Sequence, residues 1–366
     1  MLGFGIGSIF PQLKEPGNYE SWADEVERTL NLIPSIRKLE VKGGRSSFRW
    51  FDVEDADGRN DLIHHPIPVH GNVAFTINIP ARAQDRLNPW WKASVDSEVE
   101  EFVVFLELDT AYPYALVVFY SDNMIKPSSA VVIVREFLKE ELEKLGDRST
   151  LELTTLGPSP FHAEFYIKEG DQGDFVTPGL NALVRHGRGY SECEFFFDKK
   201  VFESAAHVLD EVRKKIGPEF ANFYGLTAER TVKQVSVDVL TLQVEEGVAA
   251  YRRKGAINWV RRVITSRANL RNISLELLKI QMGVTNSQRS NGKVIDNLRA
   301  ERGLLLFEGK LVGMAELDYT DQLDNLGSML KVLESQHTQT VQRITSFAVS
   351  LLGVVVGAFL TAALRK

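Results

Sequence analysis

The chain has 366 residues, a formal net charge of −6 at pH 7, 44% hydrophobic residues and 25% charged residues. This composition is ordinary for a globular protein, so it excludes a mainly disordered chain and leaves room for two folded units. Cys193 is the only cysteine, which excludes a disulfide bond within the chain and gives no sign of an oxidising compartment.

The first 226 residues predict an α+β domain with a mixed or antiparallel sheet. The chain opens without a basic segment and Pro11 interrupts its first apolar run, so we expect no signal peptide. Several strands follow one another with only turns between them, which argues against a doubly wound nucleotide-binding fold. Short apolar or alternating segments bounded by turn residues predict these strands, at residues 36–41, 48–53, 62–69, 73–79, 102–108, 114–120, 151–155, 164–167 and 192–197.

Three helices are expected among these strands. Apolar residues recur at helical spacing in residues 20–32, 129–145 and 199–216. Gly217 and Pro218 follow the third segment directly. Because glycine and proline favour helix ends, we expect that helix to stop there.

Three histidines lie close together in the sequence and are candidate metal ligands: His64, His65 and His70. Pro66 and Pro68 stand between them and make a regular strand unfavourable. Their spacing matches no known metal-binding pattern. We therefore assign no metal to this segment.

One short motif is similar to an enzyme motif. Residues 183–187 read Leu-Val-Arg-His-Gly, which resembles the phosphohistidine motif of the histidine phosphatases. In that family an arginine binds phosphate and the histidine attacks phosphorus, so the resemblance implies these roles for Arg185 and His186. It covers five residues only, and Arg188 and Gly189 stand where the family has an acidic or amide residue and a hydroxyl. The alternative is a polar loop before the strand at 192–197.

Residues 227–318 predict a helical domain that contains a basic segment. No acidic residue occurs between Gly247 and Leu275. Such a segment is suited to anionic lipid headgroups, or to the phosphates of a nucleotide or nucleic acid. It is equally suited to neutralisation by the acidic remainder of the chain. A polar stretch at 285–292 is expected to separate two helices. The basic residues are Arg252, Arg253, Lys254, Arg261, Arg262, Arg267 and Arg271.

Residues 319–343 carry a heptad pattern and predict a stalk helix. The pattern predicts a coiled coil between copies of the chain, or packing of the same stripe on the preceding helices. A histidine in such a seam costs stability but can fix register. The seam positions are Leu323, Leu326, Leu330, Leu333 and His337, continued by Thr340, Ile344 and Phe347.

Residues 344–364 contain no charged residue and predict one transmembrane helix, continuous with the stalk. About twenty residues at 1.5 Å per residue match a hydrocarbon core of about 30 Å. Small residues form a ridge along this helix that favours close helix packing in lipid. The ridge consists of Ser346, Ser350, Gly353 and Gly357. We therefore expect a single-pass, tail-anchored homo-oligomer with its N-terminal domain in the cytoplasm.

These features predict a membrane-anchored oligomeric signalling or effector protein. Its cytoplasmic domain would sense a ligand or partner, and its anchor would form pores or disrupt membranes in the manner of bacterial defence effectors. One alternative is a membrane-tethered phosphate-handling enzyme that uses Arg185 and His186. Another is a binder of phosphate or nucleic acid through the basic helix. Common hydrolase and redox motifs are absent from the sequence, which favours a non-enzyme, and no cofactor is identified.

Overall fold

The computed structural model describes residues 1–14, 21–43, 48–49, 67–68, 70–87, 100–108, 112–120, 126–154, 160–252, 256–302, 305–316 and 318–364. The chain packs into two compact units. Unit 1 comprises Met1–Arg230 and Asn291–Ala315, and unit 2 comprises Thr231–Ser290 and Glu316–Lys366. The helical stretch expected at 227–318 thus contributes to both units. The four-part division at 226, 318 and 343 stays a prediction.

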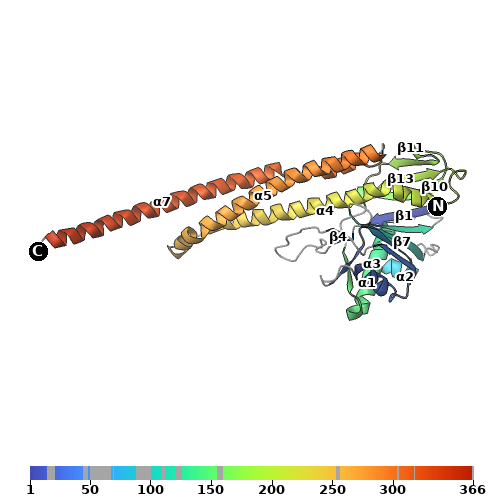
Figure 1. The fold of residues 1–366 in the computed structure, drawn as a ribbon, viewed down its shortest axis with the longest axis horizontal. Helices are drawn as coiled ribbons and strands as arrows, with labels where there is room; N and C mark the ends of the chain where they lie inside the picture. Colours follow the sequence, from blue (N-terminus) through green and yellow to red (C-terminus); the bar gives the residue numbers. More distant parts are fainter. Residues whose placement is uncertain are drawn as a thin grey trace. The chain divides into compact units, whose positions relative to one another are not determined.

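Unit 1 contains a nine-stranded mixed sheet, which confirms the expected α+β fold (Figure 1). The strand order is β11-β12-β13-β10-β1-β8-β7-β6-β3. Strands β10 and β13 are parallel, and the other neighbours are antiparallel. The strands are β1 (Leu2–Gly7), β3 (Ile36–Gly43), β6 (Gly71–Asn78), β7 (Glu101–Glu107), β8 (Tyr114–Tyr120), β10 (Ala163–Glu169), β11 (Asp174–Thr177), β12 (Leu180–Arg185) and β13 (Ser191–Phe197).

Two further antiparallel pairs and several helices complete unit 1. The pairs are β2 (Phe10–Leu13) with β9 (Leu151–Thr154), and β4 (Phe48–Arg49) with β5 (Ile67–Pro68). Much of the segments expected as strands at 48–53 and 62–69 lies outside the described residues. The complete helices of unit 1 are α1 (Trp22–Leu30), α2 (Ala81–Leu87), α3 (Pro127–Leu145) and α6 (Glu308–Ala315), with short 3-10 turns at η2 (Gly146–Arg148) and η3 (Pro160–His162). The unit also includes α4 (Ala205–Arg252) up to Arg230 and α5 (Ala256–Arg302) from Asn291.

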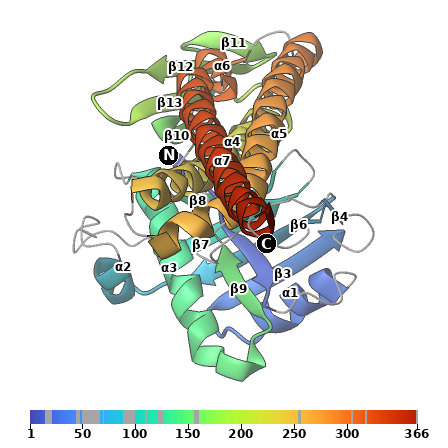
Figure 2. The same ribbon diagram turned by 90° about the vertical axis from the view of Figure 1, so that its left-hand side faces the viewer.

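Helix α3 lies along one side of the sheet (Figure 2). It packs closely on β1, because one face of that strand consists of glycines. A Cβ atom added at Gly5 would lie 2.1 Å from the Pro127 carbonyl oxygen, far inside van der Waals contact. Gly3 and Gly7 leave similar room for Phe119 and Val131. The alternating glycines that mask the strand character of β1 in the sequence therefore serve helix packing.

The opposite face of β1 points into an aromatic core. Phe4 stacks on Phe165 at a ring distance of 5.2 Å and lies 6.1 Å from Phe195. Phe220 of α4 meets Phe165 edge-on at 5.4 Å. Such pairs add about 0.5–1.5 kcal/mol beyond the area that they bury. The first part of α4 therefore covers this face of the sheet.

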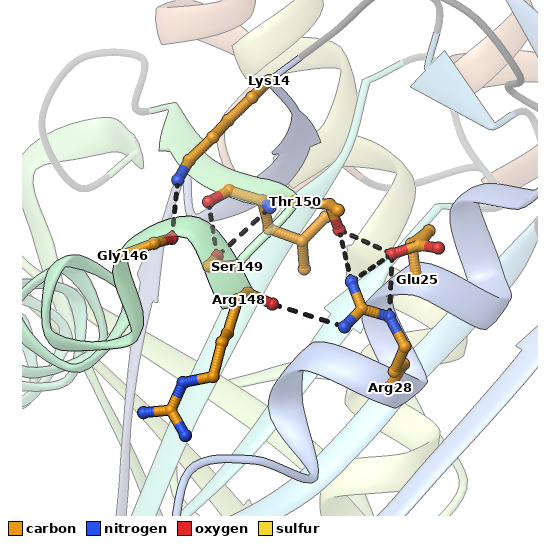
Figure 3. A network of polar contacts seen from close by, with 8 residues as sticks. Lys14, Glu25, Arg28, Gly146, Arg148, Ser149 and Thr150 are labelled. Atoms are coloured by element: carbon orange, nitrogen blue, oxygen red, sulfur yellow. Dashed lines mark hydrogen bonds and ion pairs between the residues drawn. The ribbon is translucent and has the colours of Figure 1, made fainter.

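A polar network joins α1 to the segment before β9 (Figure 3). Arg28 Nε donates to Glu25 Oε2 at 3.0 Å, and Thr150 Oγ1 donates to the same oxygen at 2.6 Å. Arg28 also donates to the Arg148 carbonyl oxygen at 3.3 Å. The hydrogen bonds from Thr150 and Arg28 lower the pKa of Glu25. All of these groups satisfy one another, so we read the network as structural.

Unit 2 is built from α4 after Arg230, from α5 up to Ser290, and from α7 (Thr320–Leu364). The expected continuous helix at 319–364 is present as α7. The four heptad leucines are buried against apolar residues of α4 and α5, so the seam packs on the preceding helices of its own chain. Self-association of the chain stays a prediction and needs other surfaces. The cluster contains Val237, Leu240, Val244, Leu270, Leu277, Val284, Tyr319, Leu323, Leu326, Leu330 and Leu333.

Two expected helix ends are wrong. Helix α4 continues through Pro218, although proline inside a helix costs about 3 kcal/mol. Phe220 and Tyr224, two and six residues further on, are fully buried and hold the helix in place. Gly217 is needed for packing, since a Cβ there would lie 2.4 Å from the Tyr114 hydroxyl.

Helix α5 likewise continues through the polar stretch at 285–292. Ser287 and Asn291 of that stretch are buried. They follow the buried Val284 by three and seven residues and therefore share its face. Polar residues on the packed side of a helix produced the apparent break.

Candidate functional site

The apolar end of α7 is the most distinctive surface of the chain. Among the described residues, one helical stretch, Glu308–Val356, is long and apolar enough to cross a bilayer. None of its most apolar window is buried inside the chain. Arg343 directly precedes the uncharged run at 344–364, and no further charge occurs until Arg365. The exposed apolar residues are Phe347, Val349, Leu351, Leu352, Val354, Val355 and Val356.

Two hydroxyl groups at this end of α7 donate hydrogen bonds within the helix. Ser350 Oγ donates to the Ser346 carbonyl oxygen at 2.9 Å, and Thr345 Oγ1 donates to the Val341 carbonyl oxygen at 3.0 Å. Polar groups in lipid need such internal partners because no water is available. These hydroxyls are therefore compatible with the hydrocarbon region.

The predicted small-residue ridge is open on α7. Ser346, Ser350 and Gly353 are exposed, and a Cβ added at Gly353 meets nothing within 4 Å. Gly357 belongs to the same helix, but its surroundings lie outside the described residues. The ridge offers a flat surface of the kind that lets two helix backbones approach in lipid.

Most of the basic segment falls outside what the structure describes. Arg252 is the last residue of α4, and Arg253 and Lys254 lie in the undescribed residues that follow. Helix α5 includes the next three arginines, whose side chains are likewise outside the described set: Arg261, Arg262 and Arg267. Arg271 is described and lies exposed on α5. Binding of lipid or phosphate by this segment stays a prediction.

Arg185 and His186 lie at the end of β12, next to β13. Arg185 Nη2 is 3.0 Å from Oε2 of Glu194, a carboxylate that is almost fully buried. Lys168 contacts the other oxygen of the same carboxylate. His186 Nδ1 lies 3.4 Å from the Ser191 hydroxyl. Because the Arg185 guanidinium already neutralises a carboxylate, a phosphate group there would compete with Glu194.

The sheet places two more carboxylates beside this pair, which sequence reasoning missed. In the parallel ladder of β10 and β13, Glu164 is opposite Glu192, and Tyr166 is opposite Glu194. These four side chains therefore share one face of the sheet. In the sequence, polar and apolar residues alternate at 164–168 and 192–195, which indicated that each strand has a polar face. The parallel pairing of β10 with β13, which brings the two polar faces together, was not predictable from the sequence.

Glu164 has a structural role at the start of α3. Its two oxygens accept hydrogen bonds from the Ser128 backbone N–H at 2.7 Å and from the Ser128 hydroxyl at 2.6 Å. A carboxylate at a helix N-terminus is favoured by the helix dipole. Burial nevertheless raises the pKa of Glu164. Glu164 and Glu194 thus each have a nearby donor or cation, which favours internal neutralisation over a ligand site.

The candidate metal ligands are not brought together in the described part of the chain. His64 and His65 lie outside it, and His70 lies exposed just before β6. Among the described residues, no group of three His, Cys, Asp or Glu side chains is arranged to hold a metal ion. Cys193 is buried in β13, and burial raises the pKa of its thiol.

Comparisons with protein-family models, curated proteins and solved structures found no match for this chain. Its function is therefore inferred from its own residues.

Proposed function

We propose that this protein is a membrane-anchored signalling or effector protein. Its α+β unit receives a ligand or partner on the cytoplasmic side, and its helical unit connects to a single membrane-spanning helix. One observation carries the proposal. Helix α7 is continuous from a half that is buried in unit 2 to an uncharged half whose apolar side chains are exposed.

The energetics of the exposed half support membrane anchoring. Full burial of a valine, leucine or phenylalanine side chain is worth about 1.5–3 kcal/mol. Seven such side chains are exposed between Phe347 and Val356, so transfer into lipid contributes on the order of 10 kcal/mol. In water that surface would instead drive aggregation. Arg343 stands at the boundary, where its charge can remain among the headgroups.

The continuity of α7 supports a coupling role. The seam that holds α7 in unit 2 runs to Leu333 and the buried His337, and the uncharged run begins at Ile344. No described residue between them departs from the helix. A helix that is fixed at one end by packing transmits its orientation to the other end. Clustering of several anchors through the small-residue ridge would then perturb the membrane.

Membrane fractionation of full-length protein tests the proposal. We expect the wild-type chain to remain in membranes after carbonate extraction. Val355→Arg places a charge in the apolar run and costs about 2.5–3.5 kcal/mol of insertion, so that variant should shift toward the soluble or aggregated fraction. Val355→Leu is the matched control and should behave as wild type. Wild-type protein in the carbonate-soluble fraction would contradict the anchor.

The two alternatives have less support. At the motif that resembles a phosphatase, Arg185 is already paired with Glu194, so a phosphate group would have to displace that carboxylate. The basic helix stays a candidate for phosphate or nucleic acid, but only Arg271 among its side chains is described.

A further inference from the structure

Unit 2 has apolar residues on faces that point away from its own core. On α5, Leu275, Leu278 and Met282 are 54%, 55% and 67% exposed and recur at spacings of three and four residues. They therefore form one stripe, opposite the side on which Leu277 packs. On α4, Leu242 is 59% exposed. We call these the α5 face and the α4 face.

The charges on the two faces are opposite. Arg271 is four residues before Leu275 and lies exposed on the same side of α5. Glu245 and Glu246 follow Leu242 by three and four residues and are exposed on α4. The α5 face is thus apolar with a basic end, whereas the α4 face is one exposed leucine with acidic residues on both sides of it, Asp238 as well as Glu245 and Glu246.

The two faces also lie at matching positions along the helix axes of unit 2, which we call their height. Helices α4 and α5 are antiparallel neighbours, and a Cβ added at Gly283 would lie 3.2 Å from Lys233 Nζ. Because the helices are antiparallel, moving one residue toward the C-terminus of α4 from this contact corresponds to moving one residue toward the N-terminus of α5. Leu242 therefore lies within about one helical turn, about 5.4 Å, of the height of Leu275. Glu245 lies equally close to the height of Arg271.

Contacts through α7 give a register that differs from this one by about six residues, or about 9 Å along the helices. Leu333 lies beside Gly247 of α4, where an added Cβ would be 3.4 Å from Leu333 Cδ1. The neighbouring Glu334 accepts a hydrogen bond from Ser274 Oγ of α5 at 3.0 Å. The Gly283–Lys233 contact joins α4 and α5 directly, and it places the acidic end of one face level with the basic end of the other.

We infer that the α5 face of one copy docks on the α4 face of a second copy of this chain. The inference rests on the proposed anchoring, because anchors in one bilayer relate copies by rotation about the membrane normal. Such a rotation keeps heights unchanged, so only residues at equal height meet. Two α5 faces would bring Arg271 against Arg271, and two α4 faces would bring acidic residues together. Only the mixed contact joins opposite charges and apolar residues.

This contact is head-to-tail, so repetition closes into a ring when the rotation divides a full turn. The heptad leucines need not open, because the contact uses the outward sides of α4 and α5. It also commits Arg271 to a neighbouring copy, so this residue is not available to lipid or phosphate in the assembly.

A charge exchange in full-length protein in mild detergent tests the contact, with mass measured by light scattering or native mass spectrometry. Arg271→Glu alone and Glu245→Arg with Glu246→Arg should each reduce a multimer to the monomer mass. The three changes combined should restore the multimer. Lys331→Glu is the matched control, because Lys331 is exposed on α7 outside both faces, and it should leave the mass unchanged. Single-face variants with the wild-type mass would overturn the inference, as would a monomeric wild type at tens of micromolar.

Cysteine cross-linking distinguishes a head-to-tail contact from a symmetric one. Leu242→Cys and Leu278→Cys chains, each with one introduced thiol, should cross-link to each other when mixed but not to themselves. The native Cys193 is buried and should not react. Self-cross-linking of either variant without mixed products would overturn the inference.

Membrane fractionation of the same variants separates this inference from the proposed function. Wild-type protein that is membrane-bound and monomeric would contradict the docking faces and leave the anchor intact. Wild-type protein that leaves membranes but keeps a charge-dependent multimer would contradict the anchor and retain the contact.

Discussion

Units 1 and 2 differ in whether their side chains find partners within the same unit. In unit 1 the buried carboxylates have partners within the same unit. Glu164 is bonded to Ser128, and Glu219 accepts the backbone N–H of Phe307 at 2.9 Å. In unit 2 one apolar seam is buried, and valine, leucine and methionine remain exposed on other sides of the same helices. Unit 1 thus satisfies these buried carboxylates internally, whereas unit 2 leaves apolar side chains exposed, as the proposed anchoring and docking require.

The largest effect that tests this contrast lies within unit 2. Leu330 is 3% exposed and belongs to the seam, whereas Val332, two residues on, is 57% exposed. Leu330→Ala should lower the free energy of unfolding of unit 2 by about 2–5 kcal/mol, because it removes packing and leaves a cavity. Val332→Ala should change it by about 0.5 kcal/mol or less. Hydrogen exchange of peptides from α4, α5 and α7 in full-length protein measures both. Equal effects would mean that the seam is not the core of unit 2.

A smaller effect is expected in unit 1, where the close approach of α3 to β1 depends on glycine. Gly5→Ala should destabilise unit 1 by about 1–3 kcal/mol, because the new methyl group meets the Pro127 backbone, which cannot move aside easily. Gly313→Ala in α6 is the matched control. Nothing lies within 4 Å of a Cβ there, so the change should stabilise the helix by about 0.5–1 kcal/mol. Urea unfolding followed by hydrogen exchange of α3 and α6 peptides gives the two values. Tolerance of Gly5→Ala would show that α3 packs less closely than described.

The smallest effect is a pH dependence of unit 1. Burial raises the pKa of Glu164 in the folded state, so the folded chain binds this proton more tightly than the unfolded chain. The contribution of Glu164 to stability is therefore highest below the unfolded pKa of about 4.3 and falls as pH rises through the raised folded pKa. Glu164→Gln should remove this decline. Glu169→Gln, an exposed change on the same strand, should retain it. The same slope in both variants would assign the decline to another group.

Local patterns in the sequence predicted much of unit 1 and all of α7. Alternation and turn residues located β6, β7, β8 and β13, because these strands follow the usual chemistry of half-buried or buried strands. The uncharged run at 344–364 needed no tertiary information. Strand β1 was missed because Gly3, Gly5 and Gly7 lower strand propensity, and their purpose is visible only once α3 is in place.

Long-range packing explains the remaining errors. Pro218 and the polar stretch at 285–292 are helix breakers by local rules, but buried neighbours on both sides override them. The seam had two interpretations because leucines at heptad spacing suit a partner chain or the same chain equally well. At the phosphatase-like motif, Glu194 lies nine residues after Arg185, and only the β12–β13 ladder brings the two together.

Unit 1 is formed by two segments that lie far apart in the sequence, so it can fold completely only after the second segment has been synthesised. Phe161 stacks on Phe307 at 4.1 Å, and Lys310 donates to the Phe161 carbonyl oxygen, so the sheet domain is covered only when residues 305–315 arrive. Ile344, the start of the uncharged run, is only the 29th residue after Ala315. At about 5–20 residues per second, the ribosome adds this stretch in roughly 1.5–6 s. The nascent α+β unit therefore acquires its last piece and the uncharged run almost together, so under the proposed anchoring little time passes between completing this unit and exposing the anchor.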